Sequence, residues 1–455
     1  MNTSLTTPEL TRILLALVAL LFFAHALGYL FQRIKLPRVV GEIAGGLLLG
    51  PTVLGFFAPN AHKWLFAAFE AESKLISLFY WLGLVLLMFT SGFDLQKSLD
   101  RDDKRTILGL TLGSTIIPFA AGWLAPYFFD FSPYLGEKKN LLALQLIIAI
   151  ATAVTSIPVL TKIFIDLKII HTRFAKIVLS TATIHDLILW VALAVATGLV
   201  SAGSSSVSSI LSHLLLTVLF FAVALRVMPK AMNFLNRLEW NPLMRSSVVG
   251  YMLFVCFLFA SVASYLNVNV VFGAMLGGVV IGMSPPGQFV KEKIHIKEVS
   301  LAFFVPVYFA IVGLKLDLVR HFDPWFFGWF LLVTTAVQML GTMASARLLG
   351  KDTLSSLNFG VAMSDRGGPA IVLATVAFEF GIINETFFVS LVLIAVITSL
   401  MAGMWFRFIL LKGYPLLKTE IDSDLSEESA TVRLDSPLAV EQSSHERLRV
   451  KTAAR

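Results

Sequence analysis

The sequence predicts an all-helical, polytopic membrane protein with 13 transmembrane helices. Hydrophobic residues make up 57% of the 455 residues and charged residues only 14%, whereas a soluble domain carries roughly 25% charged residues. The apolar residues form runs of the length that crosses the hydrocarbon core of a bilayer, about 20 residues. These runs are too long and too evenly apolar for barrel strands, so helices are expected.

Thirteen such runs follow one another along the chain. The first comes after a short segment without an early basic region, Met1–Leu10, and is long enough to span, so it is expected to be a retained helix and not a cleaved signal peptide. The runs lie near residues 11–31, 38–57, 73–93, 106–126, 141–164, 174–200, 207–228, 246–265, 268–284, 299–318, 325–348, 355–380 and 385–410.

The basic residues predict how these helices are oriented. Loops that follow odd-numbered runs, with their edges, hold 20 lysines and arginines, and the other loops hold 6. Because cytoplasmic loops carry the excess of positive charge, the N-terminus is expected outside and the C-terminus in the cytoplasm, in a plasma or bacterial inner membrane. The net charge of +7 is explained in the same way, and no nucleic-acid partner is expected.

The chain contains an internal repeat. Gly41-x-x-x-Gly45-Gly46-x-x-x-Gly50 in the second run returns as Gly273-x-x-x-Gly277-Gly278-x-x-x-Gly282 in the ninth, 232 residues later. The ends of the third and tenth runs match at an offset of 221, and Pro158 matches Pro369 at 211. Runs 1–6 are therefore expected to repeat as runs 8–13, with run 7 as connector. Equivalent runs are seven apart, so the two six-helix repeats are expected to be inverted, as in secondary transporters.

Two runs carry residues that interrupt a helix. The fifth combines hydroxyl side chains with a proline, and the twelfth places a charged dipeptide before two glycines and a proline: Thr152, Thr155, Ser156 and Pro158, and Asp365, Arg366, Gly367, Gly368 and Pro369. Proline removes a backbone donor, and glycine pairs loosen a helix. Both helices are expected to unwind and cross near the midplane, where freed carbonyls bind a cation and Arg366 balances the negative helix ends. The alternative is two ordinary proline kinks, with Asp365 and Arg366 near the membrane face.

An ionisable pair, His185–Asp186, lies in the middle of the mostly apolar stretch Phe174–Val200. A carboxylate at that depth costs at least ~2.5 kcal/mol on insertion scales, so Asp186 is expected to bind a cation or a proton. Histidine titrates near physiological pH, so His185 is expected either to carry a second proton or to act as a pH gate. The alternative is a neutral histidine that holds Asp186 by a hydrogen bond or packs away from it.

With these features the chain resembles the monovalent cation:proton antiporter superfamily, most closely its cation:proton antiporter-2 branch. The resemblance covers residues 11–410 and rests on several strings: Leu36-Pro37-Arg38-Val39-Val40-Gly41-Glu42, Gly45–Pro51, Leu86–Gly92, Pro158–Phe164 and Phe304–Phe309. It implies a 13-helix domain with a mobile core of runs 4–6 and 11–13, a dimerisation scaffold of runs 1–3 and 8–10, and run 7 as the link. It also implies a homodimer and elevator-like alternating access. The ion-binding carboxylate of the family matches Asp186.

The chain departs from the family at three positions. His185 replaces the Asn or Asp that precedes the key aspartate, Gln338 stands at the position of a family lysine, and Gly368 replaces a glutamate. Losing the lysine and the glutamate together leaves neither charge alone in a low dielectric. Asp-Asp with the lysine suggests electrogenic exchange and Asn-Asp suggests electroneutral exchange; His-Asp without the lysine fits neither, so the stoichiometry stays open.

The expected function is exchange of a monovalent cation, Na⁺ or K⁺, for protons by alternating access, with a role in pH homeostasis. Asp186, with Thr152, Thr155, Ser156 and freed backbone oxygens, is expected to bind the cation in competition with a proton. A proton-coupled transporter of an organic or other substrate, and a transport-dead sensor, are the alternatives. An enzyme is not expected, since the pair has no obvious third partner, and neither a cofactor nor a metal beyond the transported ion is expected. Residues 411–455 are expected to form a disordered cytoplasmic tail.

Overall fold

The computed structural model describes residues 5–34, 36–69, 72–93, 103–201, 207–237, 241–266, 268–285 and 287–418. These residues form helices and no strands, apart from one isolated bridge between Leu135 and Ile383. Asp94, Lys97 and Arg101, on which parts of the repeat and of the charge pattern rest, lie outside the described residues, as does most of the predicted tail.

The first half of the chain holds these helices: α1 (Thr7–Arg33), α2 (Arg38–Leu49), α3 (Leu54–Phe57), α4 (Pro59–Phe66), α5 (Glu72–Gly92), α6 (Lys104–Thr111), η1 (Leu112–Ile116), α7 (Ile117–Leu124), η2 (Ala125–Tyr127), η3 (Ser132–Tyr134), α8 (Leu141–Ala153), α9 (Ile157–Asp166), α10 (Arg173–Ser201) and α11 (Val207–Ala222). The second half holds η4 (Val223–Val227), α12 (Met228–Arg237), α13 (Pro242–Ser246), α14 (Val248–Tyr265), α15 (Val270–Gly282), α16 (Val290–Val299), η5 (Ser300–Phe304), α17 (Val305–Leu314), α18 (Leu318–His321), α19 (Pro324–Leu348), α20 (Thr353–Met363), α21 (Gly367–Glu379) and α22 (Glu385–Leu411).

Eleven helical segments within the described residues are long and apolar enough to cross a membrane. The chain is therefore an integral, multi-pass membrane protein. Two of the 13 predicted runs are helices shorter than a full crossing: 268–284 forms α15, with 13 residues, and 355–380 is divided into α20 and α21, with 11 and 13 residues.

Some helix ends differ from the predicted runs. The second run stops as α2 at Leu49, because Pro51 cannot continue the helix, and its remainder forms the short α3. The tenth segment begins earlier than predicted, at Val290, because the charged α16 runs without interruption into the apolar α17. Residues 411–418, the start of the predicted disordered tail, pack against the protein: Leu416 and Leu417 are buried, and the Asn358 side chain of α20 donates to the Leu416 carbonyl at 3.1 Å.

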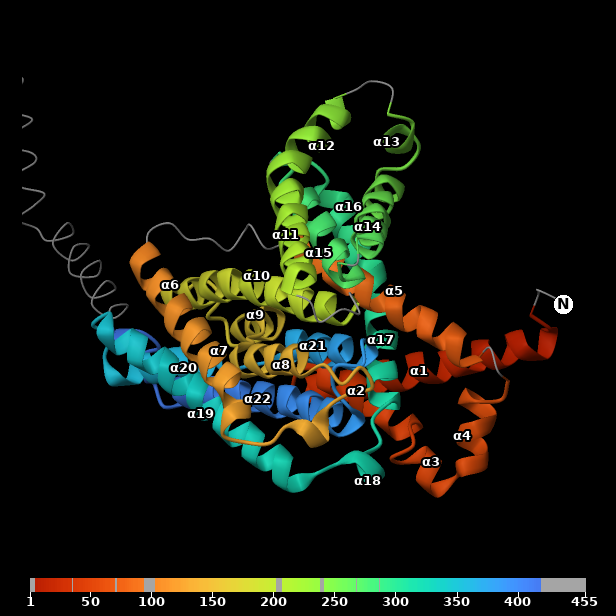
Figure 1. The fold of residues 1–455 in the computed structure, drawn as a ribbon, viewed down its shortest axis with the longest axis horizontal. Helices are drawn as coiled ribbons and strands as arrows, with labels where there is room; N and C mark the ends of the chain where they lie inside the picture. The colour runs from red at the N-terminus through yellow and green to blue at the C-terminus, as the bar shows by residue number, and fades with distance from the viewer. Residues whose placement is uncertain are drawn as a thin grey trace, which may run out of the picture.

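The helices pack in two groups (Figure 1). The first, which we call the glycine-rich group, consists of α1, α2, α5, α14, α15 and α17. Its backbones approach so closely that a Cβ on Gly46 would lie 1.7 Å from the Ala310 carbonyl oxygen, and a Cβ on Gly278 would lie 2.0 Å from that of Phe89. The second, the crossing group, consists of α6–α10 and α19–α22, which lie side by side at the left of the view.

Candidate ion-binding site

Two interrupted helices meet in the crossing group. Helix α8 ends at Ala153 and α9 begins at Ile157, while α20 ends at Met363 and α21 begins at Gly367. The prolines predicted to cause the breaks stand just after them: Pro158 and Pro369 lie in the first turn of α9 and α21, where a missing backbone N–H costs little. The breaks are thus the ends of four half-helices.

The two breaks are in direct contact. The Thr155 hydroxyl donates to the Met363 carbonyl at 2.6 Å, which joins the first break to the end of α20. Ser156 caps α9 by accepting from the Val159 N–H at 3.4 Å. Gly367 has φ of 36°, and a Cβ there would lie 2.4 Å from the Ser156 Oγ atom. Glycine is therefore required for α21 to begin against α9.

Arg366 lies inside the protein and binds the carboxyl end of α8. Its side chain is only 1% exposed. Its Nε donates to the Ala151 carbonyl at 3.2 Å and its Nη2 to the Thr152 carbonyl at 3.4 Å, while Nη1 donates to the Thr335 hydroxyl at 3.1 Å. A helix carboxyl end carries a partial negative charge, which a buried guanidinium offsets. Arg366 thus lies at the break itself, enclosed by the protein.

Gln338 of α19 completes the cap on α8. Its Nε2 donates to the Ala153 carbonyl at 2.6 Å, and lies 3.2 Å from the Val154 carbonyl and 3.1 Å from the Thr155 hydroxyl oxygen. The side chain is fully buried, and its own oxygen has no hydrogen-bond partner in the part of the chain that the structure describes. A neutral amide thus stands at the break, in the position that the sequence comparison assigned to a lysine.

Asp186 of α10 lines a small cavity beside these breaks. The cavity is lined also by Ile150 and Val154 from the α8 side, Leu189, Trp190 and Leu193 of α10, and Pro369 and Leu373 of α21. Asp186 is 6% exposed, and within the described residues no hydrogen bond or ion pair reaches its carboxylate. The cavity has a free volume of about 10 Å³, close to the least that holds one water molecule.

The other residues that were predicted to bind the ion do not line the cavity of Asp186. Thr155 and Ser156 make the break contacts above and do not line the cavity, and the Thr152 hydroxyl donates within its own helix to Ile148 at 2.8 Å. His185 is fully buried near the Ala153 carbonyl, and neither ring nitrogen makes a hydrogen bond of normal geometry to any described residue. From the first break, only Val154 lines the cavity of Asp186.

Asp365 lies next to the site but turns toward α22. Its Oδ1 accepts from the Ser399 hydroxyl at 2.6 Å, and its Oδ2 is buried with no hydrogen-bond partner among the described residues. Together, Asp365 and Arg366 bring one formal negative and one formal positive charge to the second break. Neither of these two side chains lines the cavity described above, and Asp186 is the one charged side chain among the residues that do.

Sequence analysis missed ion pairs that form between distant helices. Arg173 donates to both Asp103 carboxylate oxygens at 2.7 Å, and the Arg173 hydrogen bonds hold the pKa of Asp103 below its ordinary value. Lys315 pairs with Glu379. No pattern of local spacing marks these partners. Among the described residues, no group of three or more histidine, cysteine, aspartate or glutamate side chains is arranged to hold a metal ion.

The fold and the interrupted helices define the class of protein. The sequence profile of the transmembrane sodium/hydrogen exchanger family matches residues 15–412, and the chain belongs to this family. The solved structure of the sodium proton antiporter MjNhaP1 from Methanocaldococcus jannaschii has the same fold, with a TM-score of 0.58 and 14% identity over 89% of this chain and 99% of that one.

Two relatives are similar in sequence over most of this chain. Cation/H(+) antiporter 17 of Arabidopsis thaliana is 26% identical over 438 residues, 94% of this chain and 52% of the plant protein. The chain therefore spans about half the length of that relative. The Na(+)/H(+)-K(+) antiporter GerN of Bacillus cereus is 25% identical over 403 residues, 86% of this chain and 95% of the relative.

Proposed function

We propose that this protein exchanges a monovalent cation for protons across a membrane and that Asp186 binds both in turn. The observation that carries the proposal is the Asp186 carboxylate, which has no partner among the described residues and lines a cavity between the ends of interrupted helices. A charge left unpaired inside a membrane is costly and points to a transported or transferred ion. Membership of the exchanger family and the names of its relatives favour cation:proton exchange over catalysis or a sensor role.

The arrangement of charges allows the two loads to compete. Arg366 and Gln338 already bind the α8 carbonyls, so those oxygens are less available to a cation than the Asp186 carboxylate. Either a proton or a cation neutralises Asp186, and the neutral site then crosses the apolar surroundings at lower cost. Flux is coupled because the loaded and empty states of Asp186 stabilise two conformers differently. Thr155, Ser156 and Thr152 join the cation only if the breaks rearrange, because their hydroxyls have other partners in this conformer.

Equivalent close contacts support two inverted six-helix repeats and 13 membrane segments. Gly46 contacts Ala310, and Gly278 contacts Phe89. The two glycines are 232 residues apart, and their two partners are 221 residues apart, which are the offsets of the sequence repeat. The same offsets relate two further pairs of contacts in the glycine-rich group: Gly313 with Ile43 matches Gly92 with Met275, and Gly41 with Leu27 matches Gly273 with Phe259. Packing contacts are thus repeated along with sequence motifs. In this proposal α15 and the α20–α21 pair are the two short membrane segments.

The two packing groups suggest how access alternates. We assign the crossing group as the mobile core and the glycine-rich group as the dimerisation scaffold, because the tightest backbone contacts lie within the latter. The core then moves like an elevator past the scaffold of a homodimer. The predicted orientation, with the C-terminus in the cytoplasm of a plasma membrane, belongs to this proposal. The cation is Na⁺ or K⁺, the pair that the name of the GerN relative also carries.

Proton movement in proteoliposomes tests the proposal. Purified protein is reconstituted with an internal pH dye, a pH gradient is imposed, and Na⁺, K⁺, Li⁺ or Rb⁺ is added. We expect dye recovery with Na⁺ or K⁺ that is lost in Asp186→Asn and kept in the control Asp166→Asn, whose carboxylate is exposed and pairs with Lys162 within α9. Repeating the assay with a clamped membrane potential shows whether exchange is electrogenic, and His185→Gln shows whether histidine carries a proton.

Two results would contradict this proposal. Exchange at the wild-type rate in a folded Asp186→Asn variant would remove Asp186 from the site. A wild-type protein that moves no protons with any cation would point to an organic substrate or to a protein without transport, and a panel of organic solutes would separate these.

A further inference from the structure

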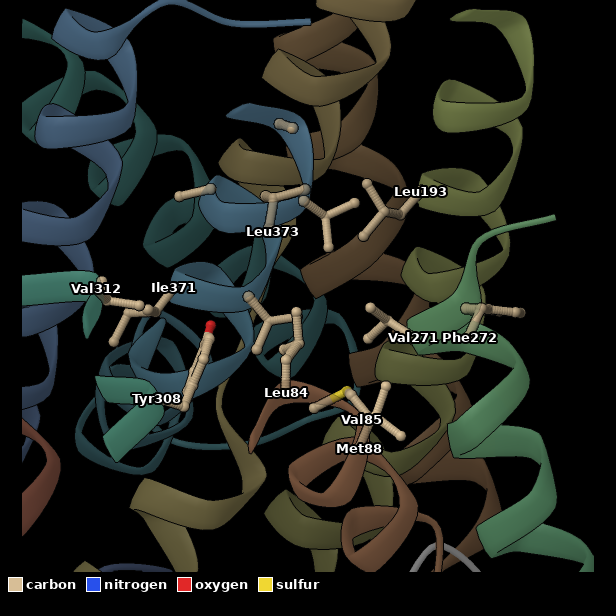
Figure 2. Close-up of a cluster of buried hydrophobic side chains, with 14 of the residues drawn as sticks. Leu84, Val85, Met88, Leu193, Val271, Phe272, Tyr308, Val312, Ile371 and Leu373 are labelled. Carbon is tan, nitrogen blue, oxygen red and sulfur yellow. The ribbon is translucent and has the colours of Figure 1, made fainter. Parts of the chain in front are cut away.

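An apolar seam separates the two packing groups. Figure 2 shows Leu84, Val85 and Met88 of α5, Val271 and Phe272 of α15, and Tyr308 and Val312 of α17 facing Leu193 of α10 and Ile371 and Leu373 of α21. Leu193 and Leu373 also line the cavity of Asp186. Apolar contacts have no fixed direction, so a seam of this kind permits one group to slide past the other at low cost.

Polar contacts cross this seam at one end. The Tyr308 hydroxyl of α17 and the Thr375 hydroxyl of α21 are 3.1 Å apart. Lys315, directly after α17, forms an ion pair with Glu379, the last residue of α21. Farther along, His321 of α18 lies 2.6 Å from the carboxylate of Glu385, the first residue of α22. All three contacts join the segment around α17 and α18 to the crossing group.

An aromatic ring also holds the Lys315 ammonium in place. Its Nζ lies 4.0 Å from the centre of the Tyr80 ring, the geometry of a cation–π interaction. The Tyr80 and Tyr308 ring centres are 5.3 Å apart, so both aromatic rings stand behind the ion pair. The Tyr80 hydroxyl is buried, and none of the described residues forms a hydrogen bond with it. Two aromatic residues of the glycine-rich group thus place the Lys315 ammonium where the carboxylate of α21 meets it.

The pair can open without leaving a charge in a dry interior. The Lys315 side chain is 30% exposed and that of Glu379 21%, so neither charge is enclosed by protein when the two separate. Breaking a fully buried ion pair would instead strand a charge at a high cost. Thr375 and Glu379 are one helical turn apart on α21, so a displacement of α21 along α17 by about 5 Å breaks both of their contacts together.

We propose that the Lys315–Glu379 pair is a latch that closes one end of the seam and shuts Asp186 off from that side of the membrane. The proposal rests on the alternating access described above. Opening the latch frees α21 to move past α17, and its closure favours the conformer seen here. In the predicted orientation this is the outer end, because α17 and α21 both run toward the face opposite the Arg347–Lys351 loop.

Cysteine accessibility tests the latch independently of transport. Leu373→Cys reports on the cavity, in a Cys256→Ala background that removes the single native cysteine. A membrane-impermeant maleimide is applied to one side of reconstituted vesicles at a time. In Lys315→Gln and in Glu379→Gln, we expect labelling from the Lys315 side to rise about fivefold, the equivalent of about 1 kcal/mol for a partly exposed pair.

Two further variants and a control make the result decisive. The double variant Lys315→Gln/Glu379→Gln should match each single variant, and the charge swap Lys315→Glu/Glu379→Lys should return labelling toward the wild-type rate. Arg320→Gln is the control, because Arg320 is 81% exposed at the same end and its partner Asp317 lies on the same side of the seam. It should leave labelling unchanged.

Several outcomes would overturn the latch. Unchanged labelling in folded Lys315→Gln and Glu379→Gln variants would do so, as would a charge swap that labels like the single variants. If the vesicles exchange no cation for protons but labelling changes as expected, the latch stands and the proposed exchange fails. If exchange is normal and labelling is unchanged, the exchange stands and the latch fails.

Discussion

Replacing Gln338 by methionine tests whether a neutral amide holds the interrupted helix in place. Methionine has a similar length and no donor, so the change removes the hydrogen bonds that reach Ala153, Val154 and Thr155 and adds little volume. The two N–H groups of the amide serve about two of these acceptors at once. Each buried acceptor left without a partner costs about 1–3 kcal/mol, so two of them predict a loss of roughly 2–6 kcal/mol in unfolding free energy.

The assay compares thermal unfolding in detergent with cation-driven proton movement in vesicles. Gln145→Met is a matched control, because Gln145 of α8 makes one such bond, to the Trp123 carbonyl at 2.7 Å, and is partly buried away from the break. We expect Gln338→Met to unfold several degrees below Gln145→Met and to lose most exchange. Equal unfolding temperatures and equal exchange rates for the two variants would refute the assignment of Gln338 as the cap.

Two other predictions concern packing and pH. Gly46→Val should lower the unfolding free energy by more than about 3 kcal/mol, because the new Cβ would overlap the Ala310 carbonyl. The yield of folded protein in detergent should fall accordingly. Gly198→Val is the control and should fold normally, because a Cβ there meets nothing within 4 Å among the described residues. Asp103→Asn should lower the unfolding temperature at pH 7, because hydrogen bonds from Arg173 hold the pKa of Asp103 below its ordinary value and the pair stabilises the fold above that value. The difference from wild type should shrink as the pH falls below about 4 and the wild-type carboxylate is protonated; a difference that is constant from pH 7 to about 3 would argue against the pair.

Local patterns predicted the order of the helices, the two interruptions and the candidate ion-binding residue. The apolar runs gave the order of the helices, since a span of about 20 residues is set by bilayer thickness alone. Thr155–Pro158 and Asp365–Pro369 marked the two interruptions, because proline and glycine act on the backbone of their own helix. Asp186 was predicted to bind an ion because a carboxylate is costly in an apolar segment, and its role remains a proposal. All of these signals come from neighbouring residues.

What the tertiary structure decided is which distant residues meet. Gln338 contacts Ala153 across 185 positions, and Lys315 finds Glu379 across 64, and neither partner is marked by the residues around it. The hydroxyls of Thr155 and Ser156 were expected beside Asp186, but the packing of α20 and α21 against the first break gives them other partners. Sequence determined where the helices break and which charge is buried, because those follow from local backbone chemistry and the cost of desolvation. Packing alone determined which groups cap the broken ends and which ion pair joins the two groups of helices, because these contacts depend on how the helices cross.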